Sequence, residues 1–272
     1  MTDSTPIEPT TPTDPGFSLG SSHVLLTGAT GFVGQAVLER LLSAHPDTRV
    51  SLLIRPKSRT TGETRLQTLL KKPVFRTWRA SVGEDEVERT IRERLSVIQG
   101  DLANPGELPG DIDVVLHGAS TVSFDPPIDD AFQTNVDGAT GLYGALLASG
   151  SDPHVVHVST AYVGGMRKGV SPEAPLEHEI DWRAENAAAK SARRRVEMAS
   201  RQPEVLRKLL AASRAKLGKV GPQAVAADAE AARIDWVTKR LIDHGRIRAE
   251  SLGWTDVYTL TKAFAERAAE EL

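Results

Sequence analysis

The sequence of 272 residues contains no cysteine and no long apolar run. The absence of thiols excludes disulfide bonds and thiolate metal sites, and it fits a reducing compartment such as the cytoplasm, where we expect the protein to be located. No apolar run approaches the roughly 20 residues needed to cross a bilayer, so no transmembrane segment is predicted. The formal net charge is only -3. Because nucleic-acid-binding proteins usually carry a strong basic excess, we expect no nucleic-acid partner.

The amino-terminal segment differs in composition from the rest of the chain. Residues 1–17 are rich in Thr, Pro, Asp and Ser, and they lack the basic start and apolar core of a signal peptide. We therefore predict a disordered tail over residues 1–20 and one α/β domain over residues 21–272.

Three glycines follow the first apolar run of that domain. The run 24–26 leads to Gly28, Gly31 and Gly34, and an amphipathic helix comes next. Glycine lets a pyrophosphate approach the backbone and lets the helix pack on the strand, while the helix amino terminus attracts the anion. A tight turn without a ligand is the alternative interpretation.

A basic cluster follows the second predicted strand, 49–54. It consists of Arg55, Lys57 and Arg59. Enzymes that use NAD place an acidic residue there for the ribose 2′-hydroxyl, whereas arginine suits a 2′-phosphate. The cluster therefore favours NADP(H), with a solvated basic loop as the alternative.

Small and polar residues end the next predicted strands. Asp101 follows the strand 95–99, and it either accepts a hydrogen bond from the adenine amino group or caps the turn. The strand 113–117 ends in a Gly-Ala-Ser run that contains Ala119, where a cofactor can lie flat. Residues 129–149 are predicted to form a helix that contains Asn135.

The strand 154–158 delivers two hydroxyl groups, Ser159 and Thr160, to the edge where open parallel sheets bind ligands. Such a hydroxyl either bonds a substrate carbonyl or satisfies a loop backbone. His117 and His157 lie within strand runs and are interpreted as core histidines. They form no metal-ligand pattern, so no metal site is predicted.

Residues of about 180–250 are rich in Ala, Arg, Glu, Lys and Leu and are predicted to form a helical insertion, broken near 218–222. The run 193–195 is interpreted as a solvated arginine face. Peripheral contact with a membrane surface, or with an anionic substrate tail, is the alternative.

Tyr258 and Lys262 open the last predicted helix, and a spacing of four residues places them on one face. An ammonium beside a phenol favours the phenolate, and such a tyrosine can pass its proton to a carbonyl oxygen as hydride reaches the carbon.

Together these motifs resemble the extended short-chain dehydrogenase/reductase superfamily, and within it the male-sterility-type fatty acyl-CoA reductases. The matching segments are 27–34, 117–124, 135–138, 157–164 and 258–266. The long interval between Thr160 and Tyr258 is also similar to this group, whereas in sugar-nucleotide epimerases and dehydratases it is much shorter.

The resemblance implies a Rossmann-type doubly wound parallel sheet with helices on both faces and a helical insertion. It implies that Thr160, Tyr258 and Lys262 are catalytic, that Asn135 supports the proton relay, and that Ser159 competes with Thr160 for the hydroxyl role. The residues expected at the cofactor are Gly28, Thr30, Gly31, Phe32, Val33, Gly34, Arg55, Asp101, Leu102, Ala119, Tyr258 and Lys262.

The implied activity is NADPH-dependent reduction of a long-chain fatty acyl-CoA thioester to the aldehyde or the fatty alcohol, a step of lipid metabolism and wax ester biosynthesis. A thioester reductase domain acting on carrier-bound acyl groups, a sugar-nucleotide epimerase or dehydratase, and an NADP-sensing protein with a vestigial site remain open. The sequence ends before the sixth strand of a 3-2-1-4-5-6 sheet. We therefore expect a carboxy-terminally truncated chain with weak NADPH binding and little turnover.

Overall fold

The computed structural model describes residues 19–57, 60–170, 173–174 and 178–272. Residues 1–18 of the predicted tail, and Arg59 of the predicted basic cluster, lie outside these ranges. Leu19 packs against the core, and its carbonyl oxygen accepts a hydrogen bond from the hydroxyl of Thr48.

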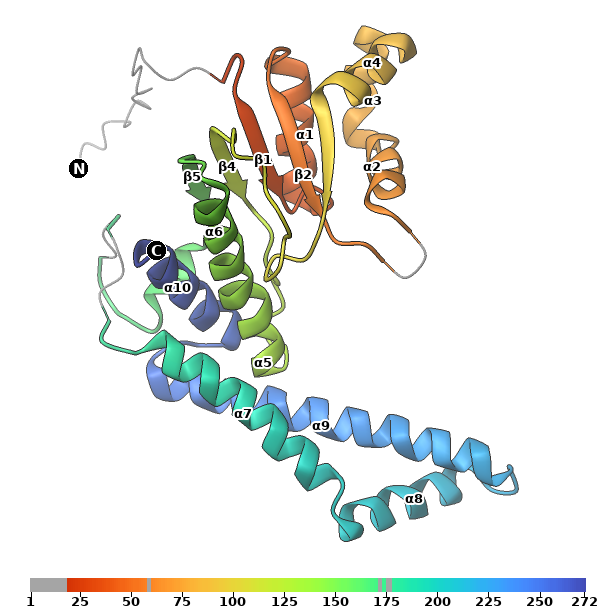
Figure 1. Ribbon diagram of the computed structural model, residues 1–272. Coiled ribbons are helices and arrows are strands. Elements are labelled where there is room, and N and C mark those ends of the chain that lie inside the picture. Colours follow the sequence, from red (N-terminus) through yellow and green to blue (C-terminus); the bar gives the residue numbers. More distant parts are fainter. Residues whose placement is uncertain (1–18, 58–59, 171–172, 175–177) are drawn as a thin grey trace, which may run out of the picture.

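Five parallel strands form one sheet in the order β3-β2-β1-β4-β5 (Figure 1). The strands are β1 (His23–Thr27), β2 (Arg49–Ile54), β3 (Leu95–Gln99), β4 (Val114–His117) and β5 (His154–His157). Thr27 lies level with Leu53 and His117, so the carboxyl ends meet at one edge of the sheet. The order reverses between β1 and β4, which is the point where such sheets bind ligands. The predicted Rossmann-type doubly wound sheet is confirmed.

Helices cover both faces of the sheet because the apolar side chains of β1 alternate between two cores. Val24 and Leu26 belong to the first core, and Leu25 belongs to the second. The first core is completed by α1 (Phe32–Ala44), α2 (Gly62–Leu70), η1 (Pro73–Phe75), α3 (Arg76–Val82) and α4 (Glu84–Arg94). The second is completed by α6 (Gly138–Ser149) and α10 (Val257–Glu270).

The segment predicted as one helix over 129–149 consists of three pieces. These are α5 (Ile128–Ala131), a π-helical turn labelled η2 (Phe132–Asp137) and α6. The wider π turn contains Asn135, which is 3% exposed. Such turns within helices are frequent at functional sites.

The helical insertion forms an arm that projects away from the sheet (Figure 1). Its helices are α7 (Trp182–Ser200), α8 (Pro203–Leu217) and α9 (Pro222–Leu252). The break at 218–222 was predicted, but the one at 201–202, where Pro203 starts α8, was not. A third core joins α7 and α9 to α5, η2 and α10. In the part of the chain that the structure describes, no helix is long and apolar enough to span a membrane.

One prediction about the arm is wrong. Arg194 and Arg195 are exposed, but Arg193 does not belong to a solvated face. Its guanidinium pairs with Asp129 at 2.5 Å and with Asp130 at 3.1 Å, and both acids lie in α5. Arg193 is therefore turned toward the body of the protein, because the acidic first turn of α5 packs against α7.

Candidate active site

The turn between β1 and α1 brings three backbone segments into close contact. Gly28 has φ of +76°, and a β-carbon there would lie 2.8 Å from the backbone nitrogen of Ala119. A β-carbon on Gly34 would lie 2.2 Å from the carbonyl oxygen of Gly28. Neither position has room for a side chain, which is the close packing that the glycine spacing predicts.

The amino terminus of α1 is left open for an anion. Gly31 is its N-cap and has no side chain to satisfy the first backbone N–H groups, which carry the positive end of the helix dipole. The side chains of Phe32 and Val33 are 93% and 58% exposed. Their predicted role at the cofactor stays a prediction.

A cleft of about 360 Å³ opens at the carboxyl edge of β1, β2, β3 and β4. Seven of the residues that were predicted to contact the cofactor line it together: Gly28, Thr30, Gly31, Arg55, Asp101, Leu102 and Ala119. Gln133 and Thr134 of the π turn also line it, and the sequence analysis missed both. The residues of α10 are not among its lining residues.

The basic side of the cleft contains an internal ion pair. Arg55 Nη1 lies 3.3 Å from Asp101 Oδ2, across the ends of β2 and β3. Arg65, from the first part of α2, lines the same cleft and donates to the carbonyl oxygen of Arg55. The sequence analysis missed Arg65, although the N-cap residue Thr61 marks the start of a helix beside this loop. Lys57 completes the basic side.

Thr27, the last residue of β1, links the end of β1 to the end of β4 by two hydrogen bonds. Its Oγ1 is hydrogen-bonded to His117 Nδ1 at 2.8 Å and accepts a bond from the backbone nitrogen of Ala119 at 3.2 Å. Burial lowers the pKa of His117 to about 3, so the imidazole is neutral. His117 is thus a buried, hydrogen-bonded histidine that helps to shape the cleft wall.

Asn135 connects the cleft to the last helix. Its Oδ1 accepts from the backbone nitrogen of Thr121, and its Nδ2 donates to the hydroxyl of Thr261, each at 2.9 Å. Thr261 precedes Lys262 directly, so the π turn positions the helix that bears the predicted catalytic pair. Sequence reasoning missed Thr261, which stands inside the Tyr-x-x-x-Lys motif.

Thr160 lies where β5 passes into the short helix η3 (Ala161–Gly164). Its Oγ1 accepts a bond from the backbone nitrogen of Tyr162 at 3.3 Å, and its own proton remains available to a ligand. The Oγ atom of Ser159 is buried and has no partner among the described residues.

The turn after Thr160 is attached to the start of α10. Met166 donates its backbone N–H to the carbonyl oxygen of Gly253, and Trp254 Nε1 donates to the carbonyl oxygen of Val163, each at 2.8 Å. Helix α10 consequently packs against η3. The tertiary fold thereby brings the helix of Tyr258 and Lys262 beside the strand end that bears Thr160.

Lys262 is 3% exposed, and its Nζ donates to the carbonyl oxygen of Val158 at 2.6 Å. Burial lowers the pKa of Lys262 to about 8, against the opposing effect of Glu266. Tyr258 packs edge-on against Phe124, with 5.6 Å between ring centroids. Within the described residues, the hydroxyl of Tyr258 bonds neither Lys262 nor Thr160.

Comparison with known proteins shows the family to which this chain is related. The model of the family described as "Male sterility protein" matches residues 26–272, which is nearly the whole chain. The chain belongs to this family. The matching model is that of an NAD-binding domain, which supports a nicotinamide cofactor for this chain.

The curated relatives of this male sterility family member are named as fatty acyl-CoA reductases. Fatty acyl-CoA reductase 1 of Arabidopsis thaliana is 24% identical over 268 residues, which cover 91% of this chain and 48% of the relative. Fatty acyl-CoA reductase 1 of Gallus gallus is 33% identical over 158 residues, covering 54% and 30%. The chain thus spans less than half the length of these relatives.

Solved structures show more distant likeness. The terminal R domain from the myxalamid PKS-NRPS biosynthetic pathway is 24% identical with a TM-score of 0.44, and the match covers 58% of this chain and 40% of that one. DesIV, a dTDP-glucose 4,6-dehydratase from Streptomyces venezuelae solved with NAD and TYD bound, is 26% identical with a TM-score of 0.39, covering 63% and 50%.

Proposed function

We propose that the protein reduces the thioester of a long-chain fatty acyl-CoA with NADPH, to the aldehyde and, by a second hydride, to the alcohol. One observation supports the proposal: α10, which bears Tyr258, packs against η3, and Lys262 Nζ donates to the carbonyl oxygen of Val158 at the carboxyl end of β5, the same edge of the sheet as the cleft. The names of the curated relatives supply the substrate class.

The cleft residues fit NADPH. The backbone between Gly28 and Gly34 and the terminus of α1 would hold the pyrophosphate, because no side chain intervenes. Arg55 would take the 2′-phosphate, with Arg65 beside it. Asp101 would accept from the adenine amino group, and Leu102, Thr30 and Ala119 would pack on the cofactor.

NADP(H) is favoured over NAD(H) by the charges of the cleft. Arg55, Lys57 and Arg65 line it, and Asp101 is the one acid among its described lining residues. Asp101 is itself paired with Arg55, so it presents no unpaired carboxylate to a ribose 2′-hydroxyl. Guanidinium groups bind phosphate through parallel hydrogen bonds, which a 2′-hydroxyl cannot provide.

The side chains near the end of β5 would bind and protonate the oxygen of the acyl carbonyl. NADPH, when bound, supplies the hydride. Thr160 and Tyr258 would donate hydrogen bonds to the oxygen that becomes negative, as in other oxyanion sites. Tyr258 would give this oxygen its proton, and the ammonium of Lys262 would stabilise the phenolate left behind. Collapse of the hemithioacetal then breaks the C–S bond and releases CoA.

The remaining site residues would act through these groups. Asn135 would keep α10 in place through Thr261, and so would support proton transfer at Tyr258. Ser159, whose Oγ is buried without a described partner, stays the competing hydroxyl donor.

The test is an assay of NADPH consumption by the purified chain with palmitoyl-CoA, with the product identified by mass spectrometry. We expect palmitaldehyde or hexadecanol, and a 10²- to 10⁴-fold loss of turnover in Tyr258→Phe with unchanged NADPH binding. Tyr162→Phe, which alters a tyrosine that is 67% exposed, is the control. A chain that forms no product from CoA thioesters, or a Tyr258→Phe variant with full turnover, would contradict the proposal.

We further expect a cytoplasmic protein that contacts membranes only peripherally, through the basic arm. Cell fractionation and co-sedimentation with vesicles of anionic phospholipid would test this. Extraction that requires detergent, rather than high salt, would contradict it.

A further inference from the structure

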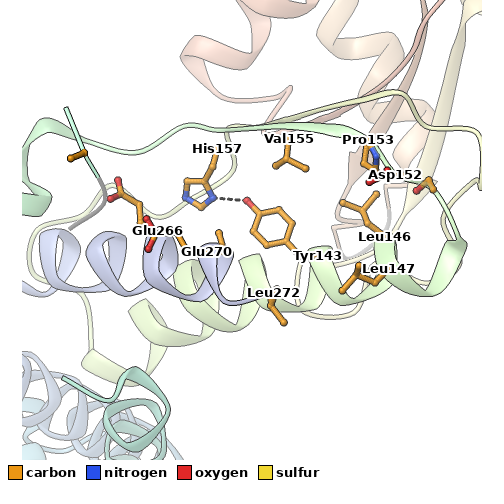
Figure 2. Close-up of a pocket in the computed structure, with 13 residues that line it drawn as sticks. Tyr143, Leu146, Leu147, Asp152, Pro153, Val155, His157, Glu266, Glu270 and Leu272 are labelled. Carbon is orange, nitrogen blue, oxygen red and sulfur yellow. Dashed lines mark hydrogen bonds between the residues drawn. The ribbon is translucent and has the colours of Figure 1, made fainter. Parts of the chain in front are cut away.

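Three side chains from three elements lie in a row beside β5. Lys262 Nζ, already bonded to the carbonyl oxygen of Val158, is 3.5 Å from His157 Nε2. The other ring nitrogen of His157, Nδ1, lies 2.5 Å from the hydroxyl oxygen of Tyr143 on α6 (Figure 2). The function proposed above uses Lys262, but it gives no role to His157 or Tyr143.

The donors and acceptors in this row fit together in one order. An ammonium has only donors, so His157 must present the lone pair of Nε2 to Lys262. The ring proton is then on Nδ1 and is donated to the oxygen of Tyr143. The hydroxyl of Tyr143 lies at the pocket that this residue lines, on the side of β5 shown in Figure 2. The ammonium of Lys262 therefore selects the tautomer of His157, and the hydroxyl of Tyr143 accepts the ring proton on the other side.

The surroundings keep the imidazole neutral. Burial lowers the pKa of His157 to about 4, and the charge of Lys262 adds to the effect. His117 of β4, with 5.1 Å between the two ring centroids, is neutral as well. Glu266, further along α10, favours the charged form of Lys262, whereas burial disfavours it. A neutral His157 can therefore accept a hydrogen bond at Nε2 from Lys262, whose pKa is about 8.

We propose that His157 is a positioning residue for Lys262: with its own ring proton donated to Tyr143, it accepts a hydrogen bond from the ammonium through Nε2. The proposal rests on the function proposed above, in which Lys262 assists Tyr258. One N–H of Lys262 is held by Val158 and a second by His157. Two of the three N–H groups are then occupied, and the third is the one that would assist Tyr258.

Two substitutions of His157 separate this role from simple packing. The amide oxygen of His157→Gln reaches the place of Nε2 and can accept from Lys262. The shorter His157→Asn ends near the place of Nδ1, within reach of Tyr143 but not of Lys262. Because a lost acceptor disfavours the ammonium, His157→Asn should lower the pKa of Lys262 by about one unit. His157→Gln should restore it.

The first readout does not depend on catalysis. NMR titration of the lysine ε signals, with Lys262→Met to assign the resonance, measures the pKa of Lys262 in each variant. The ¹⁵N shifts of His157 report the tautomer, which should be Nδ1–H in the native chain and should lose this preference in Lys262→Met, which has no ammonium. His154→Gln, at the other end of β5, is the control and should change neither quantity.

The second readout is the pH profile of reduction. The alkaline limb of kcat should move to lower pH in His157→Asn by the same amount as the pKa of Lys262, with the KM for NADPH unchanged. An unchanged titration of Lys262 in His157→Asn, or a native His157 protonated at Nε2, would overturn the proposal. A shifted Lys262 in a chain that reduces no acyl-CoA would support the role of His157 and contradict the proposed function.

Discussion

Arg55 and Asp101 form an ion pair across the carboxyl ends of β2 and β3, with 3.3 Å between Nη1 and Oδ2. The pair places one positive and one negative group at the part of the cleft where the adenosine end of a dinucleotide is expected. Both side chains are largely exposed, so the pair is too solvated to contribute much to folding. Its importance lies in ligand selection, and it leads to the first prediction.

Arg55→Ala should raise the Kd of NADPH by about 10- to 100-fold, because hydrogen bonds to charged groups contribute about 1.5–3 kcal/mol. The Kd of NADH should change little, since NADH has no 2′-phosphate. Arg49→Ala is the matched control, because Arg49 begins the same strand and pairs with Asp111 at 2.9 Å, at the opposite end of the sheet. Fluorescence titration of both cofactors measures the effect. Equal weakening of NADH and NADPH would contradict the assigned role of Arg55.

Gly34→Ala should destabilise the protein by about 1–3 kcal/mol and weaken dinucleotide binding, because the new β-carbon would stand 2.2 Å from the carbonyl oxygen of Gly28. Gly144→Ala makes the same chemical change in α6, where the β-carbon meets nothing within 4 Å. That control should gain about 0.5–1 kcal/mol from better helix propensity. Urea denaturation compares the two variants. A Gly34→Ala chain as stable as Gly144→Ala would show that α1 does not pack closely on the turn.

The stability of the protein should fall as the pH is lowered from about 6.5 toward 3. Burial lowers the pKa of His117 from 6.5 to about 3, so the unfolded chain binds a proton in this range that the folded chain excludes. His157, with a pKa lowered to about 4, acts in the same direction. At 1.36 kcal/mol per pH unit, His117 alone contributes up to about 5 kcal/mol.

His117→Asn should flatten this dependence, although it lowers stability at pH 7 because the smaller side chain leaves part of the buried imidazole's space empty. His154→Gln, which changes an exposed histidine, should leave the slope as it is. Thermal or urea unfolding at a series of pH values measures it. A slope that persists in His117→Asn would assign the acid sensitivity to other groups.

Much of the fold was predictable from local patterns. The strands 49–54 and 95–99 were predicted with their observed bounds, because each apolar run is closed on both sides by charged residues or glycine. The first turn was predictable because a glycine spacing constrains the backbone itself. Of the seven cleft residues, Asp101 and Ala119 were expected at strand ends, because parallel strands end at a common edge, whereas the full set was implied by the family resemblance.

Other features depend on contacts that no local pattern contains. Asn135 and Thr261 are 126 positions apart, and their hydrogen bond exists because the π turn packs on α10. Arg193 was expected in solvent, but packing of α7 on α5 places two carboxylates beside it. Arg65 lines the cleft because α2 packs against β3, a contact between segments that are separated along the chain.

The amino-acid sequence alone determined the strands of the sheet and the glycine turn before α1, because both depend on side-chain periodicity and on allowed backbone angles. The tertiary structure decided which side chains meet at the reacting end of β5. Lys262 and His157 are 105 positions apart. They meet because α10 packs beside the end of β5, a strand that is far from it along the chain.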